Sequence, residues 1–227
     1  MRIAFLTGLS LILSACAAPN PTVQQGPDAE VSYDGLYRVD HARFKLVYVD
    51  PAIDFSRYTK IIPGGAVYEF RTVDKHSTQR ARSSASEFWI SDADRERLEK
   101  ETSEIFREEI AKSTRFEITD TRAPDALVIR GALHDIVSYV PPDIVGRGEI
   151  YLSSVGEATL IIEGVDSVSG EVIFRVIERR VAESAGSMPT MSSSVSSWAE
   201  VRRMLRRWAS TFREGLDAVP TGSAASE

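Results

Sequence analysis

Few side chains in this sequence have the types and spacing that catalysis or metal binding requires, and histidine is scarce. The three histidines are His41, His76 and His134. No two of them have the spacing of transition-metal ligands, so we expect no metal site. His134 and Asp135 are adjacent and could be the base and the orienting acid of a Ser-His-Asp triad. Adjacent residues of a strand point to opposite faces, however, so we interpret them as polar residues that close a strand.

Two aspartates, Asp50 and Asp54, flank Pro51 and could pair as acid and base. Such aspartates more often accept hydrogen bonds from their own backbone in a turn, and we favour that interpretation. The serines at 192–197 lack the Gly-x-Ser-x-Gly elbow of hydrolases. The glycines at 146–148 lack the third glycine and the following helix of a phosphate-binding loop. The sequence therefore identifies no catalytic residue, no cofactor-binding residue and no metal ligand.

A cluster of arginines lies near the carboxyl end of the chain. Its members are Arg202, Arg203, Arg206, Arg207 and Arg213. They could contact anionic lipid headgroups or an acidic partner. Glu200 and Glu214 dilute the positive charge, so a solvated and ion-paired helix face is the simpler interpretation.

Length and composition are those of one globular domain. The chain has 227 residues, of which 43% are apolar and 26% charged, enough to bury a core. The formal net charge of −6 gives no general attraction to nucleic acid, so no nucleic-acid partner is expected. The single cysteine, Cys16, excludes an internal disulfide.

The amino-terminal segment has the organisation of an export signal. Arg2 supplies a positive charge, and residues 3–13 are apolar but too short to span a bilayer. The next residues, Leu13-Ser14-Ala15-Cys16, resemble the lipobox of bacterial lipoproteins. The resemblance implies that residues 1–15 are a lipoprotein signal peptide and that Cys16 carries the lipid, including palmitate. The alternative is an ordinary secretory signal that is cleaved near Ala18.

The residue after the cysteine, Ala17, favours the outer membrane by resemblance to the sorting pattern of enterobacterial lipoproteins. We therefore expect a lipid-anchored protein on the periplasmic face of the bacterial outer membrane, because two or three acyl chains anchor stably. Residues 16–32 are read as the lipidated cysteine and a flexible tether. A single globular domain is expected at 33–219, followed by a disordered tail at 220–227.

The remaining pattern predicts an α+β domain. Apolar alternation and turn residues indicate strands at 44–49, 60–70 with a bend at 63–65, 116–118, 126–133, and a hairpin of 148–165 with 171–180. Ala158, Leu160 and Ile162 are expected on the core face of that hairpin. We expect a mostly antiparallel or mixed sheet of about five strands with two principal helices packed on it.

Capping residues and apolar spacing predict the two helices. Ser91 is expected to cap a helix that ends near Thr114. Ser197 and Glu200 form a capping box for the second helix. Its apolar stripe comprises Val201, Leu205, Trp208, Phe212 and Leu216. Residues 71–86 and 182–197 are expected to be loops.

Several segments resemble a family of bacterial envelope lipoproteins, domain of unknown function 3313. They are Tyr33–Leu36, Val47–Tyr58, Asp125–Asp135, Asp166-Ser167 with Gly170–Val172, and Trp198–Leu216. The segment with the pattern Pro-x-x-Asp-Phe-Ser-x-Tyr is the most specific. The family implies an envelope lipoprotein but supplies no catalytic residues.

We expect a non-enzymatic binding or assembly accessory of the cell envelope, with the membrane and an envelope protein as partners. One alternative is an envelope hydrolase that uses Asp50, Asp54, His134 or Asp135 close together in a cleft. Another is a carrier of lipids or small molecules, which requires an apolar cavity of several hundred Å³.

Overall fold

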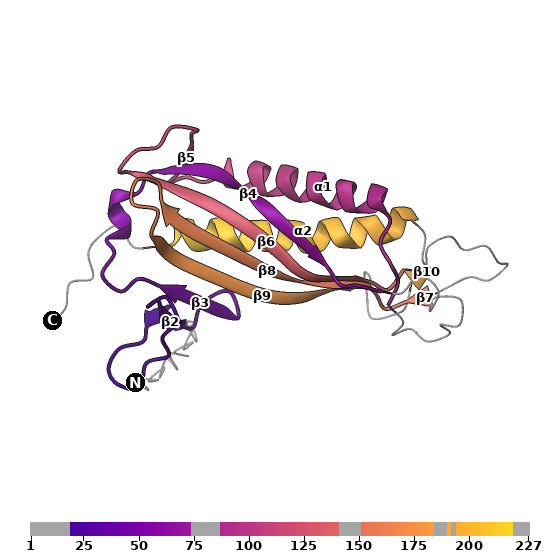
Figure 1. The fold of residues 1–227 in the computed structure, drawn as a ribbon, viewed down its shortest axis with the longest axis horizontal. Helices are drawn as coiled ribbons and strands as arrows, with labels where there is room; N and C mark the ends of the chain where they lie inside the picture. The colour runs from indigo at the N-terminus through magenta and orange to yellow at the C-terminus, as the bar shows by residue number, and fades with distance from the viewer. Residues whose placement is uncertain (1–18, 74–86, 141–150, 184–189, 192–193, 220–227) are drawn as a thin grey trace, which may run out of the picture.

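The structure is a computed structural model that describes residues 19–73, 87–140, 151–183, 190–191 and 194–219. Figure 1 shows the elements along the chain. The strands are β1 (Thr22–Val23), β2 (Tyr37–Asp40), β3 (Leu46–Val49), β4 (Lys60–Phe70), β5 (Glu117–Ile118), β6 (Ala126–Ser138), β7 (Tyr151–Leu152), β8 (Ser154–Asp166), β9 (Val172–Glu183) and β10 (Thr190–Met191). The helices are α1 (Asp92–Ile110) and α2 (Ser194–Asp217), with one 3-10 turn, η1 (Phe55–Arg57).

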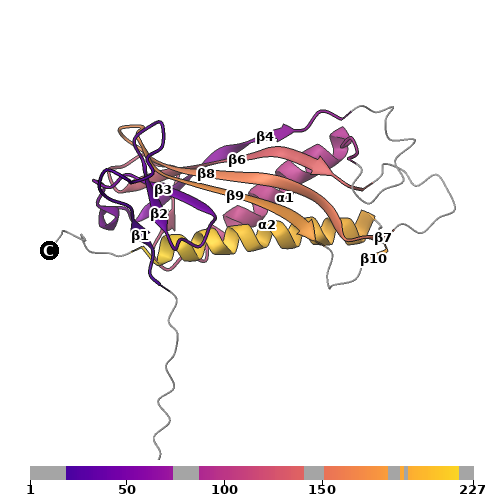
Figure 2. The same cartoon turned by 90° about the horizontal axis from the view of Figure 1, so that it is seen from below.

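Eight of the described strands form one sheet in the order β1-β2-β3-β9-β8-β6-β4-β5. Strands β6, β8 and β9 are its antiparallel centre, whereas β4 runs parallel to β5 and β6. Parallel neighbours need a long connection, and α1 lies in the one that joins β4 to β6. Both helices cover the same face of the sheet, and we call the opposite face the open face (Figures 1 and 2).

The predicted hairpin is confirmed as β8 and β9. Gly170 has φ of +78°, which a residue without a side chain adopts at little cost. Ala158, Leu160 and Ile162 are buried on the helix side, as their alternation predicts. Gly164 continues that row, and a Cβ atom there would overlap the ring of Phe174, so the close packing requires glycine.

Helix α1 begins at its predicted cap, and α2 forms along its predicted apolar stripe. The Ser91 hydroxyl accepts a hydrogen bond from the Asp94 N–H at 3.2 Å and so begins α1. The α2 stripe is buried from Leu205 to Leu216, and both Leu205 and Trp208 are 0% exposed. This stripe closes the core over the central strands.

Helices α1 and α2 lie side by side and run in the same direction. Near their middle, Arg202 of α2 is 3.3 Å from Glu101 of α1. Beyond the end of α1, the Ser113 hydroxyl donates to Asp217 at 2.6 Å. The two pairs join residues that are 101 and 104 positions apart in the chain.

The expectation of about five strands is wrong, since the main sheet has eight. The additional strands are short. Thr22–Val23 pairs with Val39 and Asp40 of β2, and the side-chain amide of Gln24 donates to Asp40 at 2.8 Å. Part of the expected tether at 16–32 is therefore attached to the domain by hydrogen bonds that leave no apolar pattern in the sequence.

The predicted start of the last helix is also wrong. Helix α2 begins at Ser194, so Ser197 lies inside the helix and is buried. The loop expected at 182–197 is shortened from both sides, because β9 continues to Glu183. Serine, which caps helices well, is also tolerated inside them, and a run of serines therefore locates the start poorly.

Other expectations fall outside the described residues. These are the signal peptide at 1–15, Cys16, the segment 74–86 of the expected loop, and the tail at 220–227.

Candidate functional site

The two aspartates near Pro51 act as turn caps. Asp50 accepts a hydrogen bond from the Ala52 N–H at 2.8 Å, and Asp54 accepts one from the Ser56 N–H at 2.9 Å. Hydrogen bonding by Ser56 holds the pKa of Asp54 below its usual value. The interpretation of both residues as local turn caps is therefore confirmed.

The neighbours His134 and Asp135 bind different partners. The His134 Nδ1 contacts the Glu69 carboxylate. Asp135 sits in an irregularity of β6 with φ of +55°, and its carboxylate binds Arg71 and Arg179. The two side chains therefore do not form the base and orienting acid of a triad.

The pair Asp50 and Asp54 also lies far along the sheet from the pair His134 and Asp135. The Asp50 N–H bonds to the carbonyl of Ile173 at 2.8 Å, near the start of β9. His134 pairs with Thr159, which pairs with Arg179 six residues farther along β9. Six residues of strand span about 20 Å. The hydrolase hypothesis needs these side chains in one cleft, and the structure separates them.

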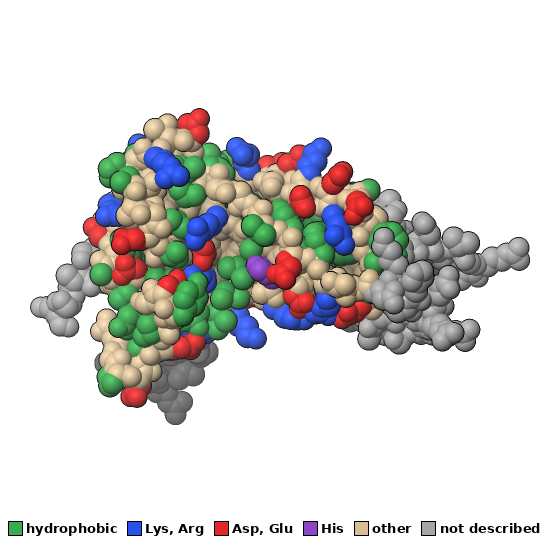
Figure 3. Space-filling model, in the orientation of Figure 1, with side chains coloured by type: hydrophobic (Ala, Val, Ile, Leu, Met, Phe, Trp, Pro, Cys, Tyr) green, Lys and Arg blue, Asp and Glu red, His purple; other side chains and the backbone are tan. Residues whose placement is uncertain are grey.

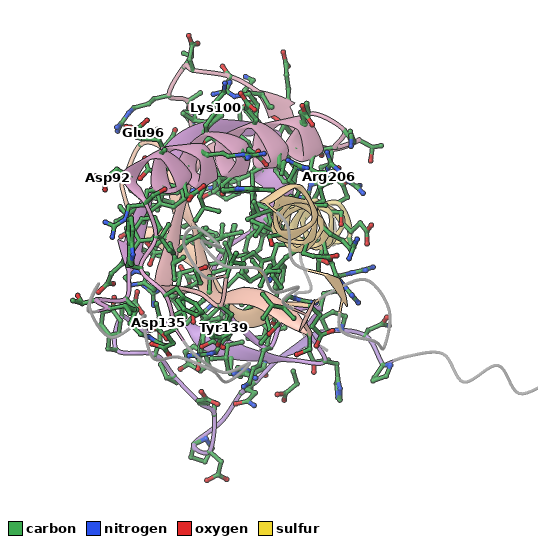
Figure 4. All side chains as sticks on the ribbon, turned by 90° about the vertical axis from the view of Figure 1, so that its right-hand side faces the viewer. Asp92, Glu96, Lys100, Asp135, Tyr139 and Arg206 are labelled. Atoms are coloured by element: carbon green, nitrogen blue, oxygen red, sulfur yellow. The ribbon has the colours of Figure 1, made fainter. Side chains whose placement is uncertain are left out.

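A charged network crosses the open face around Arg71. Its guanidinium makes two hydrogen bonds to Asp135, at 2.7 and 2.5 Å, and lies 3.6 Å from Glu157. The hydrogen bond from Arg71 lowers the pKa of Asp135. Burial, and then the charge of Glu157, raises the pKa of Tyr139. Figure 4 shows Asp135 and Tyr139 together on the side of the sheet away from the helices.

A second charged group centres on Arg175, which is only 8% exposed. Its guanidinium binds Asp34 at 2.6 Å and Glu163, its cross-strand neighbour, at 2.7 Å. The hydrogen bond from Arg175 lowers the pKa of Asp34 to about 2. Because Asp34 precedes the sheet's second strand in the chain, this group fastens the segment before β2 to the open face.

A third group lies at the end of the sheet where β8 turns into β9. The Tyr58 hydroxyl donates to Asp166 at 2.8 Å, and Arg57 contacts the same carboxylate. The other carboxylate oxygen accepts the N–H groups of Val168 and Ser169 at 2.9 and 2.8 Å. Two of the segments that carry the resemblance to domain of unknown function 3313, although 108 residues apart, therefore meet in one buried cluster.

The protonation states in this cluster are fixed by its geometry. Burial raises the pKa of Asp166, but hydrogen bonds from Ser169, Tyr58 and Val168 and the charge of Arg57 lower it to about 2 overall. Burial and the bond to Asp166 raise the pKa of Tyr58 to about 12. At neutral pH the Asp166 carboxylate stays charged and the Tyr58 phenol stays neutral. The ion pair and the hydrogen bonds that hold the cluster together are therefore maintained.

An apolar row crosses the open face between the charged groups. Its members are cross-strand neighbours on five strands: Val67, Ala132, Ile161, Ile177 and Leu46. Val67 is 65% exposed. Figure 3 shows hydrophobic side chains on this face among acidic and basic ones. Sequence reasoning missed the row, although Ile161 signals it as an apolar residue among the polar positions of β8.

A small cavity lies between the end of β4 and the start of α1. It has a volume of about 200 Å³ and is lined by Phe70, Arg71, Thr72, Val73, Trp89, Ile90, Asp92 and Arg95. Ligand pockets generally measure about 300–1,000 Å³, so this cavity does not favour the carrier hypothesis. Within the described residues, no group of three or more His, Cys, Asp or Glu side chains could hold a metal ion.

The arginines of α2 divide into two sets. Arg202, Arg203 and Arg213 pair with acidic side chains of α1 or α2, as the simpler interpretation predicts. Arg206 and Arg207 are exposed and have no ion pair within the part of the chain that the structure describes.

Comparison with known proteins places the chain in a family. Residues 28–212 match the family described as "Protein of unknown function (DUF3313)", and the chain belongs to it. No curated protein matches the chain. In the described part of the structure, no helix is long and apolar enough to cross a membrane.

Among solved structures, the chain is similar to a dodecamer of a single-residue variant of PelC from Paraburkholderia phytofirmans. The identity is 15% and the TM-score 0.33, with 77% of this chain and 98% of that chain covered. It is also similar to a putative neuraminyllactose-binding hemagglutinin homolog from Helicobacter pylori. Here the identity is 12% and the TM-score 0.40, with 71% of this chain and 87% of that chain covered.

Proposed function

We propose that this protein is an outer-membrane-anchored periplasmic lipoprotein whose domain binds another component of the cell envelope. The observation that carries the anchor is Cys16 within the sequence Leu13-Ser14-Ala15-Cys16. The thiol accepts the lipid, and the small residues before it fit a signal peptidase. Two or three acyl chains then hold the domain at the membrane.

A binding or assembly role, rather than catalysis, is supported by how the candidate side chains are used. Asp50 and Asp54 cap turns, and Asp135 is held between arginines. The apolar row of the open face offers a surface for the partner, since its exposed member Val67 lies among ion-paired residues that can supply a polar rim.

Mass spectrometry tests the anchor. The Cys16 peptide of the wild type should carry a diacylglyceryl group and an acyl chain, and the protein should fractionate with the outer membrane. The Cys16→Ala variant should lose both properties. An unmodified Cys16 peptide from the mature wild type would refute the anchor.

Photo-crosslinking in living cells tests the binding surface. A photoreactive residue at Val67 should capture one dominant envelope protein. The matched control is Val168, which is 64% exposed but lies in the turn between β8 and β9. Equal crosslinking from both positions, or none from Val67, would contradict a partner on the open face.

A further inference from the structure

The first described residues leave the domain beside α2. Strand β1 pairs with β2, so the chain is fixed from Thr22 onward. Three residues after β2, Arg43 binds Glu214 near the carboxyl end of α2 at 3.1 Å. Figures 2 and 4 both show the first described residues on the side of the molecule where α2 lies.

This geometry limits how far the lipid can lie from α2. Cys16 precedes Thr22 by six residues, and an extended chain covers at most about 3.6 Å per residue, or about 20 Å in total. Arg206 and Arg207 precede Glu214 by seven or eight residues, which is about 11 Å along a helix. A bilayer that holds the lipid of Cys16 is therefore within reach of this helix.

The charge on this part of α2 suits an anionic surface. Arg206 and Arg207 project away from the buried stripe and lack ion pairs among the described residues, and Figure 4 shows Arg206 on the outer side of the helix. Nearby acidic residues are already paired, Glu200 with Arg203 and Glu214 with Arg43. Because the whole chain has a formal net charge of −6, an anionic membrane would repel most of its surface. The repulsion favours an approach in which this helix faces the membrane.

We infer that the face of α2 bearing Arg206 and Arg207 rests on the anionic headgroups of the membrane that holds the lipid of Cys16. This inference depends on the proposed lipid anchor. The domain then has a fixed orientation. Helix α2 faces the membrane, and the open face with its apolar row lies on the opposite side of the sheet from α2. Each arginine near an anionic surface raises membrane association about fivefold, so the pair contributes about 25-fold.

The test places a fluorophore on the inferred contact. Ser210 follows Arg206 and Arg207 by four and three residues and so lies on the same side of α2. The lipidated mature protein with Ser210→Cys is labelled there and reconstituted into phosphatidylcholine vesicles, with or without phosphatidylglycerol, that carry a headgroup quencher. We expect quenching only with phosphatidylglycerol, and its loss near 1 M salt, where the Debye length is about 3 Å.

The variant Arg206→Gln/Arg207→Gln should lose this quenching. A matched control, Lys100→Gln/Arg130→Gln, changes the net charge equally on α1 and on the open face and should keep it. Equal quenching in both variants, or no quenching at Ser210 in the wild type, would overturn the inference. A protein crosslinked in cells to this position, without quenching, would overturn it in favour of an acidic protein partner.

The mass of the Cys16 peptide is measured on the same preparation before reconstitution. A peptide without lipid overturns the anchor and the inferred orientation together. A lipidated peptide without quenching overturns the orientation alone and leaves the anchor intact.

Discussion

Replacing Asp166 by asparagine removes one charge from the cluster that joins Arg57 and Tyr58 to the β8–β9 turn. The native environment lowers the pKa of this carboxyl from 3.8 to about 2. At about 1.4 kcal/mol per pKa unit, this shift corresponds to about 2 kcal/mol of stability. Because the folded-state pKa is depressed, the stabilisation is present above the unfolded-state pKa and is lost as pH falls toward 2. The variant should therefore be about 2 kcal/mol less stable at neutral pH, with the difference shrinking on acidification.

Urea unfolding followed by circular dichroism, repeated from neutral to acidic pH, measures this difference. Asp28→Asn is the matched control, because Asp28 is exposed and its replacement should cost little stability. The reasoning is refuted if the deficit of Asp166→Asn stays constant on acidification, since the carboxylate charge would then not be its source.

Further changes test the packing and the caps, each by the free energy of unfolding. Trp208→Ala should cost about 3–5 kcal/mol, because the side chain is 0% exposed in the core; a cost below that of a surface change would contradict its place there. Gly164→Ala should cost about 1–3 kcal/mol through its collision with the Phe174 ring, whereas Gly215→Ala, with open space around its Cβ, should stabilise α2 by about 0.5–1 kcal/mol. Equal effects of the two glycine changes would argue against the close contact. Ser91→Ala should cost about 1 kcal/mol by removing the cap of α1, and an unchanged stability would show that the cap contributes nothing.

The parts of the fold that were predicted correctly have a local signal. The stripe from Leu205 to Leu216 and the cap at Ser91 are readable because helix periodicity and capping chemistry act within a few residues. Strand β1 could not be predicted, because Thr22–Val23 becomes a strand only through its pairing with β2. The parallel pairing of β4 with β6 has no local signal either, since a helix and a short strand intervene.

The contacts of the candidate site, like the elements of the fold, were predictable where the partner residues lie close together in the sequence. Asp50 and Asp54 could be read as turn caps because their partners lie two residues away. The contact of Arg57 with Asp166 joins residues 109 positions apart and has no local signal. The pair of Glu163 and Arg175 is an intermediate case, because the turn that ends at Gly170 fixes the register of the hairpin and so places the two charges opposite each other.

The parallel arrangement of α1 and α2 has a consequence for the order in which the domain is built. The helices meet through residues 101 and 104 positions apart, and α2 supplies the buried Leu205 and Trp208. At about 5–20 residues per second, the 34 residues between the end of β9 at Glu183 and the end of α2 at Asp217 take roughly 2–7 s to synthesise. During that interval the apolar face of β6, β8 and β9 has no complete cover, and it is most exposed to aggregation or chaperone binding. The apolar face of the sheet is therefore protected only once α2, the last helix to be synthesised, has packed on it.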